Sequence, residues 1–334
     1  MAKRRITHQQ RRRIEDQRQQ RKDRANDAVA AAQGDEALGP EQTGLVIEHF
    51  GRQLNVEASD GQIVRCHLRA NLDQLIAGDR VIWQRGSETG VIVAAQERRS
   101  VLTRPDSNGQ PRPVAANIDQ ALIVIAPEPQ AFANLIDRYL IAAEAHDIRA
   151  LLVHNKSDID THPELDVMLE RYKAIGYPVL RVSNKTGEGL AKLKAALRDQ
   201  ISIFVGQSGV GKSSLVNSLL PEANTAVGAL SEATVKGRHT TTTAKLFHFP
   251  DGGDLIDSPG IREFGVQNLS RDEVDRGFCE FLPYMDRCRF RDCRHQSEPG
   301  CALLAALEAH GKSKGVASLC IGGGEAVAMA VERV

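Results

Sequence analysis

Long apolar runs are missing from this 334-residue sequence, and no stretch of about eighteen apolar residues could cross a membrane as a helix. The basic residues 1–24 lack the apolar segment of a secretory signal peptide, and Glu15, Asp16 and Asp23 argue against a mitochondrial transit peptide. These absences exclude the membrane and secreted classes, so we expect a cytoplasmic protein with no membrane partner.

Net charge is also absent, since 43 Lys and Arg residues balance 43 Asp and Glu residues. The distribution is uneven, because residues 1–34 hold ten basic residues against four acidic ones. A dense basic arm on a neutral body favours a nucleic-acid partner, and the alternative is a solvated tail without one. Residues 1–40 contain too few apolar residues to fold alone, so we expect a disordered arm there.

Alternating apolar and polar residues predict an all-β domain near the N-terminus. Asp60-Gly61 is typical of a hairpin turn between its second and third strands, and the longer link before the fourth strand favours a small closed barrel of the OB type. Such barrels often bind nucleic acid, and the alternative is a generic barrel used as a spacer. The five strands are expected at 43–50, 52–59, 62–69, 79–84 and 89–96.

From residue 115 onward, apolar strand runs alternate with helical patterns, which indicates a parallel α/β sheet. Ligands of such sheets gather at the carboxyl ends of the strands, where the motifs described next are found. Strands with their polar loops are expected at 120–126, 149–158, 177–183, 201–209 and 253–260, and helices at 131–146, 163–175, 188–199 and 211–220.

A phosphate-binding motif, Gly206-x-x-x-x-Gly211-Lys212-Ser213, lies between an apolar strand and a helix. Its glycines allow backbone N–H groups to wrap phosphates, and the helix N-terminus favours their negative charge. We expect Lys212 to reach the β- and γ-phosphates and Ser213 to bind Mg²⁺; the alternative is a glycine-rich turn without a ligand. The candidate nucleotide-binding residues are Gly206, Gln207, Ser208, Gly209, Val210, Gly211, Lys212, Ser213 and Ser214.

The segment HNKSD separates GTP from ATP, which a phosphate loop alone does not. The carboxylate of Asp158 can accept both the N1–H and the exocyclic amine of guanine, whereas adenine would leave that carboxylate unpaired. Asn155 can hydrogen-bond the base, and the stem of Lys156 can lie along the base plane. The candidate residues of this loop are Asn155, Lys156, Ser157 and Asp158.

A second base loop is expected where the next strand ends in SNKTGEG, residues 183–189. Ser183 and Asn184 could supply backbone contacts to the base. The alternative for both segments is a polar loop that simply follows a strand.

Two further segments match the γ-phosphate sensors of a GTPase. Asp257 of DSPG fits the residue that helps hold Mg²⁺, and Gly260 can donate its N–H to the γ-phosphate. One of the threonines 240–242, assigned to Thr241, is expected to bind Mg²⁺ in the GTP state and form the first switch, although a threonine run can also be merely β-prone.

The catalytic apparatus lacks one expected residue. Ile261 follows DSPG, where Ras-type GTPases carry a glutamine that orients the attacking water. We therefore expect slow intrinsic hydrolysis. His239 is the best local group for positioning the water, and the alternative is an exposed loop histidine. The candidate catalytic residues are His239, Lys212 and Gly260.

The six cysteines are expected to be reduced thiols or metal ligands, because disulfides are rare without secretion. Cys288-x₄-Cys293-x-His295-x₅-Cys301 supplies three thiolates and one imidazole, which suit one structural, tetrahedral Zn²⁺ per chain. Cys279 and His310 are possible substitutes as ligands, and the alternative is a set of unrelated reduced thiols. In so small a unit, metal binding would supply much of the folding free energy.

Together these motifs make residues 43–310 resemble the RsgA/YjeQ family of circularly permuted GTPases. The resemblance rests on SVLTRPD, AANIDQ, NKSD, GQSGVGKSSLVN, HTTTTAKLFHFPDGGDLIDSPGIREFG and CRFRDCRH with EPGC. It implies an OB barrel, a permuted GTPase domain and a small helical zinc domain. It also implies GTP hydrolysis stimulated by the small ribosomal subunit during late maturation of that subunit. The family pattern supports the four zinc ligands, the hydrophobic residue after DSPG and the histidine before the threonines.

The reversed order of the motifs is interpreted as this permutation, because NKSD comes before the phosphate loop and each part is present once. The last residues depart from the family, since 314–334 resemble the C-terminus of thiolases. No other thiolase motif occurs, so no thiolase activity is assigned. The expected domains are a basic arm (1–40), the barrel (41–100), the GTPase domain (101–270), the zinc domain (271–312) and an atypical tail (313–334).

The functional hypothesis is a monomeric GTPase whose cofactors and ligands are GTP or GDP, Mg²⁺ and Zn²⁺. GTP is expected to order 237–245 and 257–265, which would change the pose of the adjoining zinc unit on a partner. The barrel and the basic arm would hold rRNA of the small subunit. One alternative is a non-catalytic, nucleotide-dependent RNA-binding module, and another is an ATP-using small-molecule kinase.

Overall fold

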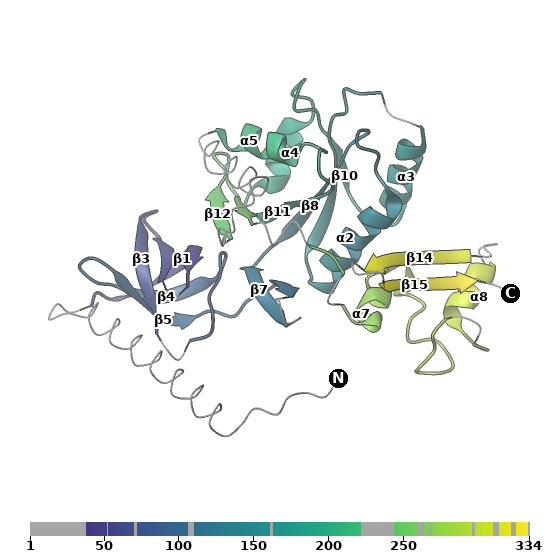
Figure 1. The fold of residues 1–334 in the computed structure, drawn as a ribbon, viewed down its shortest axis with the longest axis horizontal. Coiled ribbons are helices and arrows are strands. Elements are labelled where there is room, and N and C mark those ends of the chain that lie inside the picture. The colour runs from purple at the N-terminus through teal and green to yellow at the C-terminus, as the bar shows by residue number, and fades with distance from the viewer. Residues whose placement is uncertain are drawn as a thin grey trace. The chain divides into compact units, whose positions relative to one another are not determined.

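The computed structural model describes residues 38–51, 53–69, 72–105, 110–160, 163–221, 244–258, 264–266, 269–295, 298–309, 314–321 and 325–332. The chain divides into two compact units (Figure 1). The first ends at Arg99 and also takes in the start of β12 (Lys245–His248). The second begins at Ser100 and holds the rest of the chain, so each unit is described separately.

The first unit is a five-stranded barrel, as predicted. Its strands run in the order β1-β2-β3-β5-β4, and β4 pairs back onto β1 to close it. Alternate residues of the strands point inward and bury Trp83 with Val46, Val56 and Cys66. The strands are β1 (Glu41–Phe50), β2 (Gln53–Ala58), β3 (Ile63–Leu68), β4 (Arg80–Arg85) and β5 (Gly90–Ala95).

The second unit is built on a parallel sheet, which confirms the predicted α/β class. Five strands lie in the order β10-β9-β8-β11-β13, with parallel pairing of β10 to β9, β9 to β8, β8 to β11 and β11 to β13. Every residue of the central strand β8 is buried. The strands are β8 (Gln120–Ile125), β9 (Arg149–His154), β10 (Val179–Arg181), β11 (Ile201–Val205) and β13 (Asp254–Asp257).

Helices lie where the 3.6-residue patterns predicted them. α4 and α5 bury leucines against Leu122 and Val124 of β8, whereas Ile136 of α2 lines a small cavity with Ile123 and Ile125. The alternating residues of β8 thus face different helices. The helices are α2 (Ala133–Ala145), α3 (Pro163–Ala174), α4 (Leu190–Leu197) and α5 (Lys212–Leu219).

The C-terminal part of the second unit is joined to α2. Val274 of α7 (Arg271–Arg276) and Val266 pack against Ile141, and the ring of Phe264 stacks on Tyr139. Ser270 and Glu273 form a capping box that fixes the start of α7. A short 3₁₀ helix η3 (Cys279–Phe281) and α8 (Ala302–Ala309) follow, which agrees with the predicted small helical domain.

Two hairpins were not predicted. β6 (Val101–Pro105) pairs with β7 (Pro111–Ala116), and β14 (Lys314–Ile321) pairs with β15 (Glu325–Glu332). The first contains prolines, which argue against a central strand but are compatible with a two-stranded ribbon. The second occupies the thiolase-like tail. Among the described residues, no helix has both the length and the apolar character needed to cross a membrane.

Candidate functional site

The phosphate loop joins β11 to α5, at the carboxyl end of the central strands. Gly206, Gly209 and Gly211 have positive φ angles of 137°, 85° and 96°, a region that side-chain-bearing residues rarely adopt. A Cβ atom at Gly206 would meet the Val124 carbonyl oxygen. The sequence therefore builds a backbone cradle here, and Val210 is buried beneath it.

The ammonium group of Lys212 lies over this cradle. Its Nζ donates to the carbonyl oxygens of Gly206 and Gln207, each at 2.7 Å. Ser208, Ser213 and Ser214 are exposed around the start of α5. A cation and a helix N-terminus at one place form an environment that favours phosphate.

The NKSD loop follows β9 and contacts the phosphate loop directly, although some fifty residues separate them in the chain. Asn155 is 2% exposed, and its Nδ2 donates to the Val210 carbonyl at 2.9 Å. Lys156 donates to the Gly209 carbonyl at 2.9 Å and to the Glu128 carbonyl at 2.6 Å. The two loops are thus tied together by side-chain hydrogen bonds.

Asp158 is held by the second base loop, which follows β10. Ser183 donates through Oγ to Asp158 Oδ1 at 2.6 Å, and Lys185 Nζ lies 3.8 Å from Oδ2. The hydrogen bond from Ser183 lowers the pKa of Asp158, with a smaller contribution from the charge of Lys185. The hydrogen bond therefore further stabilises the ionised carboxylate, which is the form that can accept two hydrogen bonds from a guanine base.

The second base loop also reaches the phosphate helix. Asn184 donates through Nδ2 to the Ser214 carbonyl at 3.3 Å. Within the described residues, the buried Oδ1 atoms of Asn155 and Asn184 have no hydrogen-bond partner. Ser157, the remaining residue of NKSD, donates to Glu188 at 3.4 Å. Two unsatisfied acceptors beside a glycine cradle fit a ligand that carries donors.

Of the sensor residues, Asp257 is described and ends β13, with Ser258 buried after it. β13 pairs with β11, so Asp257 lies on the strand beside the one that leads into the phosphate loop. Thr241, His239, Gly260 and Ile261 lie outside the described residues, and their predicted roles stay predictions.

The sequence interpretation missed one anchor of this site. Glu128 lies in the loop between β8 and α2 and offers only its backbone carbonyl, to Lys156. A backbone acceptor leaves no signal in residue identity. The side-chain roles of Lys156 and Asn184 were also unforeseen, because the pattern indicated contacts to a base rather than hydrogen bonds between loops.

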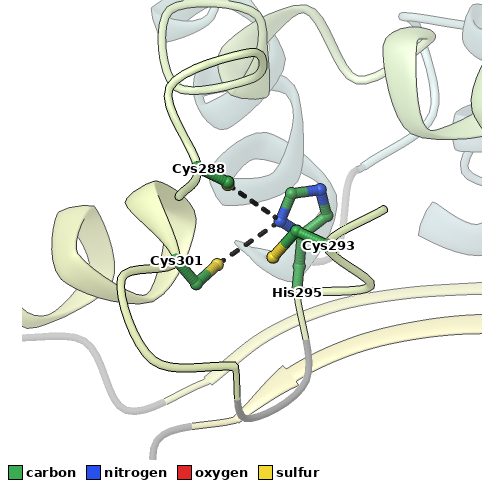
Figure 2. A group of neighbouring side chains, drawn as sticks. All are labelled: Cys288, Cys293, His295 and Cys301. Atoms are coloured by element: carbon green, nitrogen blue, oxygen red, sulfur yellow. Dashed lines mark hydrogen bonds between the residues drawn. The ribbon is translucent and has the colours of Figure 1, made fainter. Parts of the chain in front are cut away.

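Cys288, Cys293, His295 and Cys301 form a second cluster (Figure 2). Their ligand atoms all lie within 4.8 Å of one another, and His295 Nδ1 lies 3.6 Å from Cys288 Sγ and 3.4 Å from Cys301 Sγ. Burial raises the pKa of Cys293 to about 12 and also raises that of Cys301. The predicted Cys₃His set is therefore brought together in the fold.

The spacing fits a tetrahedral ion. Zinc bonds are about 2.3 Å long to sulfur and about 2.0 Å long to nitrogen. At tetrahedral angles, these lengths place a sulfur ligand and a nitrogen ligand about 3.6 Å apart. Cys279 is not part of this group, because its Sγ faces the Ile175 carbonyl instead. The other possible substitute, His310, lies outside the described residues. The arrangement can hold a metal ion.

A family model described as RsgA GTPase matches residues 95–267. A relative in Azotobacter vinelandii is named "Small ribosomal subunit biogenesis GTPase RsgA"; it is 57% identical, and the match covers 92% of this chain and 93% of the relative. A relative of the same name in Pseudomonas aeruginosa is 56% identical with the same coverage.

Two solved structures are similar in fold. YjeQ from Thermotoga maritima has a TM-score of 0.66 and 31% identity, with 82% of this chain and 94% of that chain covered. YloQ, described as a circularly permuted GTPase, has a TM-score of 0.64 and 27% identity, with 82% and 90% covered.

Proposed function

The chain belongs to the RsgA GTPase family, and we propose that it hydrolyses GTP to GDP and phosphate during biogenesis of the small ribosomal subunit. The names of its relatives support both parts of this proposal and favour catalysis over a non-catalytic binding module. The expected partner is the small subunit with its rRNA, and such a partner implies a cytoplasmic location.

One observation carries the assignment of the nucleotide. The base loop and the phosphate loop are joined by the Asn155–Val210 and Lys156–Gly209 hydrogen bonds, so guanine recognition and phosphate binding belong to one site. Asp158, whose ionised form is stabilised by Ser183, would supply the paired acceptor that guanine requires. Neither feature is needed by a site that binds phosphate alone.

The phosphate chemistry follows from the cradle. Backbone N–H groups of 206–214 would bind the β- and γ-phosphates, and Lys212 would exchange its loop carbonyls for phosphate oxygens. Ser213, Asp257 and Thr241 are proposed to hold Mg²⁺. When bound, that ion would neutralise charge that develops on the phosphates.

Water attack on the γ-phosphate needs a group that orients the water. Ile261 cannot do this, so His239 is proposed to position the water and Gly260 to donate its N–H to the γ-phosphate. Hydrolysis would then be slow until a partner orders these residues. This is the physical reason to expect stimulation by the subunit.

The Cys₃His cluster is proposed to hold one Zn²⁺ in a structural role. Four protein ligands leave no open position for a reacting water. The ion would therefore fix the loop 287–301 and take no part in hydrolysis.

Multiple-turnover GTP hydrolysis tests the proposal, measured with and without purified small subunits. We expect subunits to raise the rate by at least about tenfold, because binding would hold the switch residues in the arrangement that hydrolysis requires. Lys212→Ala should bind no nucleotide and show no activity at either condition. Equal rates with and without subunits would contradict coupling to the subunit, and hydrolysis by Lys212→Ala would reveal a contaminant.

A further inference from the structure

Phe290 lies on the metal-binding loop, between the cluster residues Cys288 and Cys293, and 44% of its surface is exposed. It does not join the small core of this part of the chain, where Phe278, Phe281 and Tyr284 pack around Cys301 and Leu303. A single exposed phenylalanine is ordinary in itself. Its surroundings distinguish this one.

Arginines surround Phe290. Residues 287–294 contain Arg287, Arg289, Arg291 and Arg294 but only one acidic residue, Asp292, which leaves this loop a net charge of +3. All four arginines are exposed. In the described part of the chain, no carboxylate pairs with any of their guanidinium groups. Without a carboxylate partner, these positive charges are available to a polyanion.

The aromatic ring is held in a defined place. The guanidinium carbon of Arg289 lies 5.5 Å from the centre of the Phe290 ring, and the Arg289 N–H donates to the Gly300 carbonyl at 3.0 Å. The Phe290 carbonyl accepts from the Cys293 N–H at 3.3 Å. Phe290 lies between two residues of the Cys₃His cluster, Cys288 and Cys293. The ring therefore has little conformational freedom to lose when it binds a ligand.

We propose that the Phe290 ring, extended by Arg289, is a stacking platform for an unpaired RNA base, and that Arg287, Arg291 and Arg294 pair with the flanking phosphates. The inference rests on the proposed function, because it assigns a contact to the rRNA partner. Aromatic rings and guanidinium planes are the surfaces on which single-stranded bases stack.

The chemistry favours RNA over a protein partner. Stacking needs an exposed aromatic ring beside cations, and residues 287–294 offer both. An apolar protein groove would instead require neighbouring apolar side chains, and the residues on both sides of Phe290 are arginines. A regular duplex would also pair with the charges but would offer the ring no base face.

The test uses the full-length chain and two RNA probes, a single-stranded 12-nucleotide oligoadenylate with unpaired bases and a blunt 12-base-pair RNA duplex, at fixed salt. Phe290→Ala should weaken oligoadenylate binding about 5- to 100-fold, as expected for one lost base stack. Duplex binding should change less than about twofold. Phe290→Leu should behave like Phe290→Ala, and Phe290→Trp should bind at least as tightly as the native chain.

Phe290→Trp gives a second readout. The native chain has a single tryptophan, Trp83, which is fully buried in the barrel. The new exposed indole should therefore report stacking as fluorescence quenching on adding oligoadenylate, and the absence of quenching would overturn the proposal.

Controls separate this role from folding. Leu282→Ala removes another exposed apolar side chain of the same part of the chain, 47% exposed, and should leave oligoadenylate binding unchanged. In all variants, the metal content per chain and the basal rate of GTP hydrolysis should equal those of the native chain. Equal loss of oligoadenylate binding in Leu282→Ala and Phe290→Ala would overturn the proposal.

Binding to purified small subunits, measured in parallel, distinguishes the two proposals. If the native chain binds oligoadenylate through Phe290 but binds no subunits, the proposed function fails and the stacking platform stands. If Phe290→Ala weakens subunit binding but not oligoadenylate binding, the residue faces a protein and the platform is wrong. Unchanged binding of both probes also overturns the platform while leaving the proposed function intact.

Discussion

At the level of single residues, the hydrogen bond from Ser183 favours the charged form of Asp158 that guanine recognition would need. Guanine presents two donors on one edge, and only an ionised carboxylate accepts both. Ser183, buried at the end of β10, donates to this carboxylate at 2.6 Å and lowers its pKa. If Asp158 reads guanine as proposed, its acceptor state is supported by a serine whose side chain need not touch the base.

Ser183→Ala should make GTP binding more sensitive to acid. Loss of the hydrogen bond raises the pKa of Asp158 toward its ordinary value of 3.8, so the carboxylate gains a proton at a higher pH than in the native chain. A titration of GTP affinity from about pH 7 to about pH 3 should show the decline of affinity begin at a higher pH in Ser183→Ala than in the native chain, with a loss below about tenfold near neutral pH.

Ser157→Ala is the matched control for that titration, because the Ser157 hydroxyl faces Glu188 rather than Asp158. The same linkage has a consequence for folding. A depressed carboxyl pKa contributes stability that is present above the unfolded-state value and is lost as the pH falls through the folded one. An unshifted affinity profile in Ser183→Ala would show that another group sets the charge of Asp158.

Among the elements, the three loops after β9, β10 and β11 act together. The Asn155–Val210 bond ties the first loop to the third, and the Asn184–Ser214 bond ties the second loop to α5. These bonds hold the phosphate cradle before any ligand arrives. They cannot discriminate between bases, which is the role that we propose for the Asp158 carboxylate.

Asn155→Ala and Asp158→Asn should therefore have different effects. The first removes a buried hydrogen bond to the cradle and should lower affinity for both GTP and GDP about tenfold. The second should mainly reduce the preference for GTP over ATP. Isothermal titration with GTP, GDP and ATP measures both effects. If the two variants lose guanine preference equally, the loops do not have the separate roles assigned to them.

The loop 287–301, which carries the Cys₃His cluster, is the other element that we expect to depend on a few side chains. Removing the ion with a chelator, or replacing one ligand in Cys301→Ser, should abolish bound zinc and unfold the region around 287–301. Nucleotide binding should persist, because the phosphate and base loops have their own hydrogen bonds. Metal content per chain, thermal unfolding and GTP affinity check these outcomes.

Cys279→Ser is the matched control, since its thiol lies outside the cluster and should leave metal content native. Full retention of zinc by Cys301→Ser would exclude that residue as a ligand.

For the whole molecule, the main feature is that each unit buries its own core. Trp83 centres the barrel core, and the cluster around Leu122, Val153 and Leu215 belongs to the GTPase unit. Gly90 leaves room for the indole, because a Cβ there would lie 2.6 Å from Trp83 Cε3 and 2.7 Å from Cys66 Sγ. The two units should therefore respond to different perturbations.

Gly90→Ala should destabilise the barrel by about 1–3 kcal/mol through overpacking and leave GDP affinity unchanged. GDP at a hundred times its Kd should stabilise the GTPase unit by about 2.7 kcal/mol and leave the barrel unaffected. Differential scanning calorimetry resolves the two transitions. Ile63→Ala, at a barrel position 58% exposed, should change neither. A single transition that shifts with both perturbations would show that the units unfold together.

The sequence by itself determined most of the elements and the residue types on which the proposed chemistry depends. The residue patterns predicted the five barrel strands and the α/β strands and helices within a few residues, because hydrophobic period and turn residues act locally. The phosphate loop, NKSD and the Cys₃His set were recognisable because their chemistry depends on residue type and spacing.

Only the tertiary structure decided how these parts meet. NKSD precedes the phosphate loop by some fifty residues, yet parallel strands bring their carboxyl ends to one edge of the sheet, where Asn155 reaches Val210. The Glu128 anchor and the Ser183 bond to Asp158 also depend on contacts between distant segments. Local patterns cannot specify such contacts, since a hydrogen-bond partner is chosen by proximity in the fold and not by order in the chain.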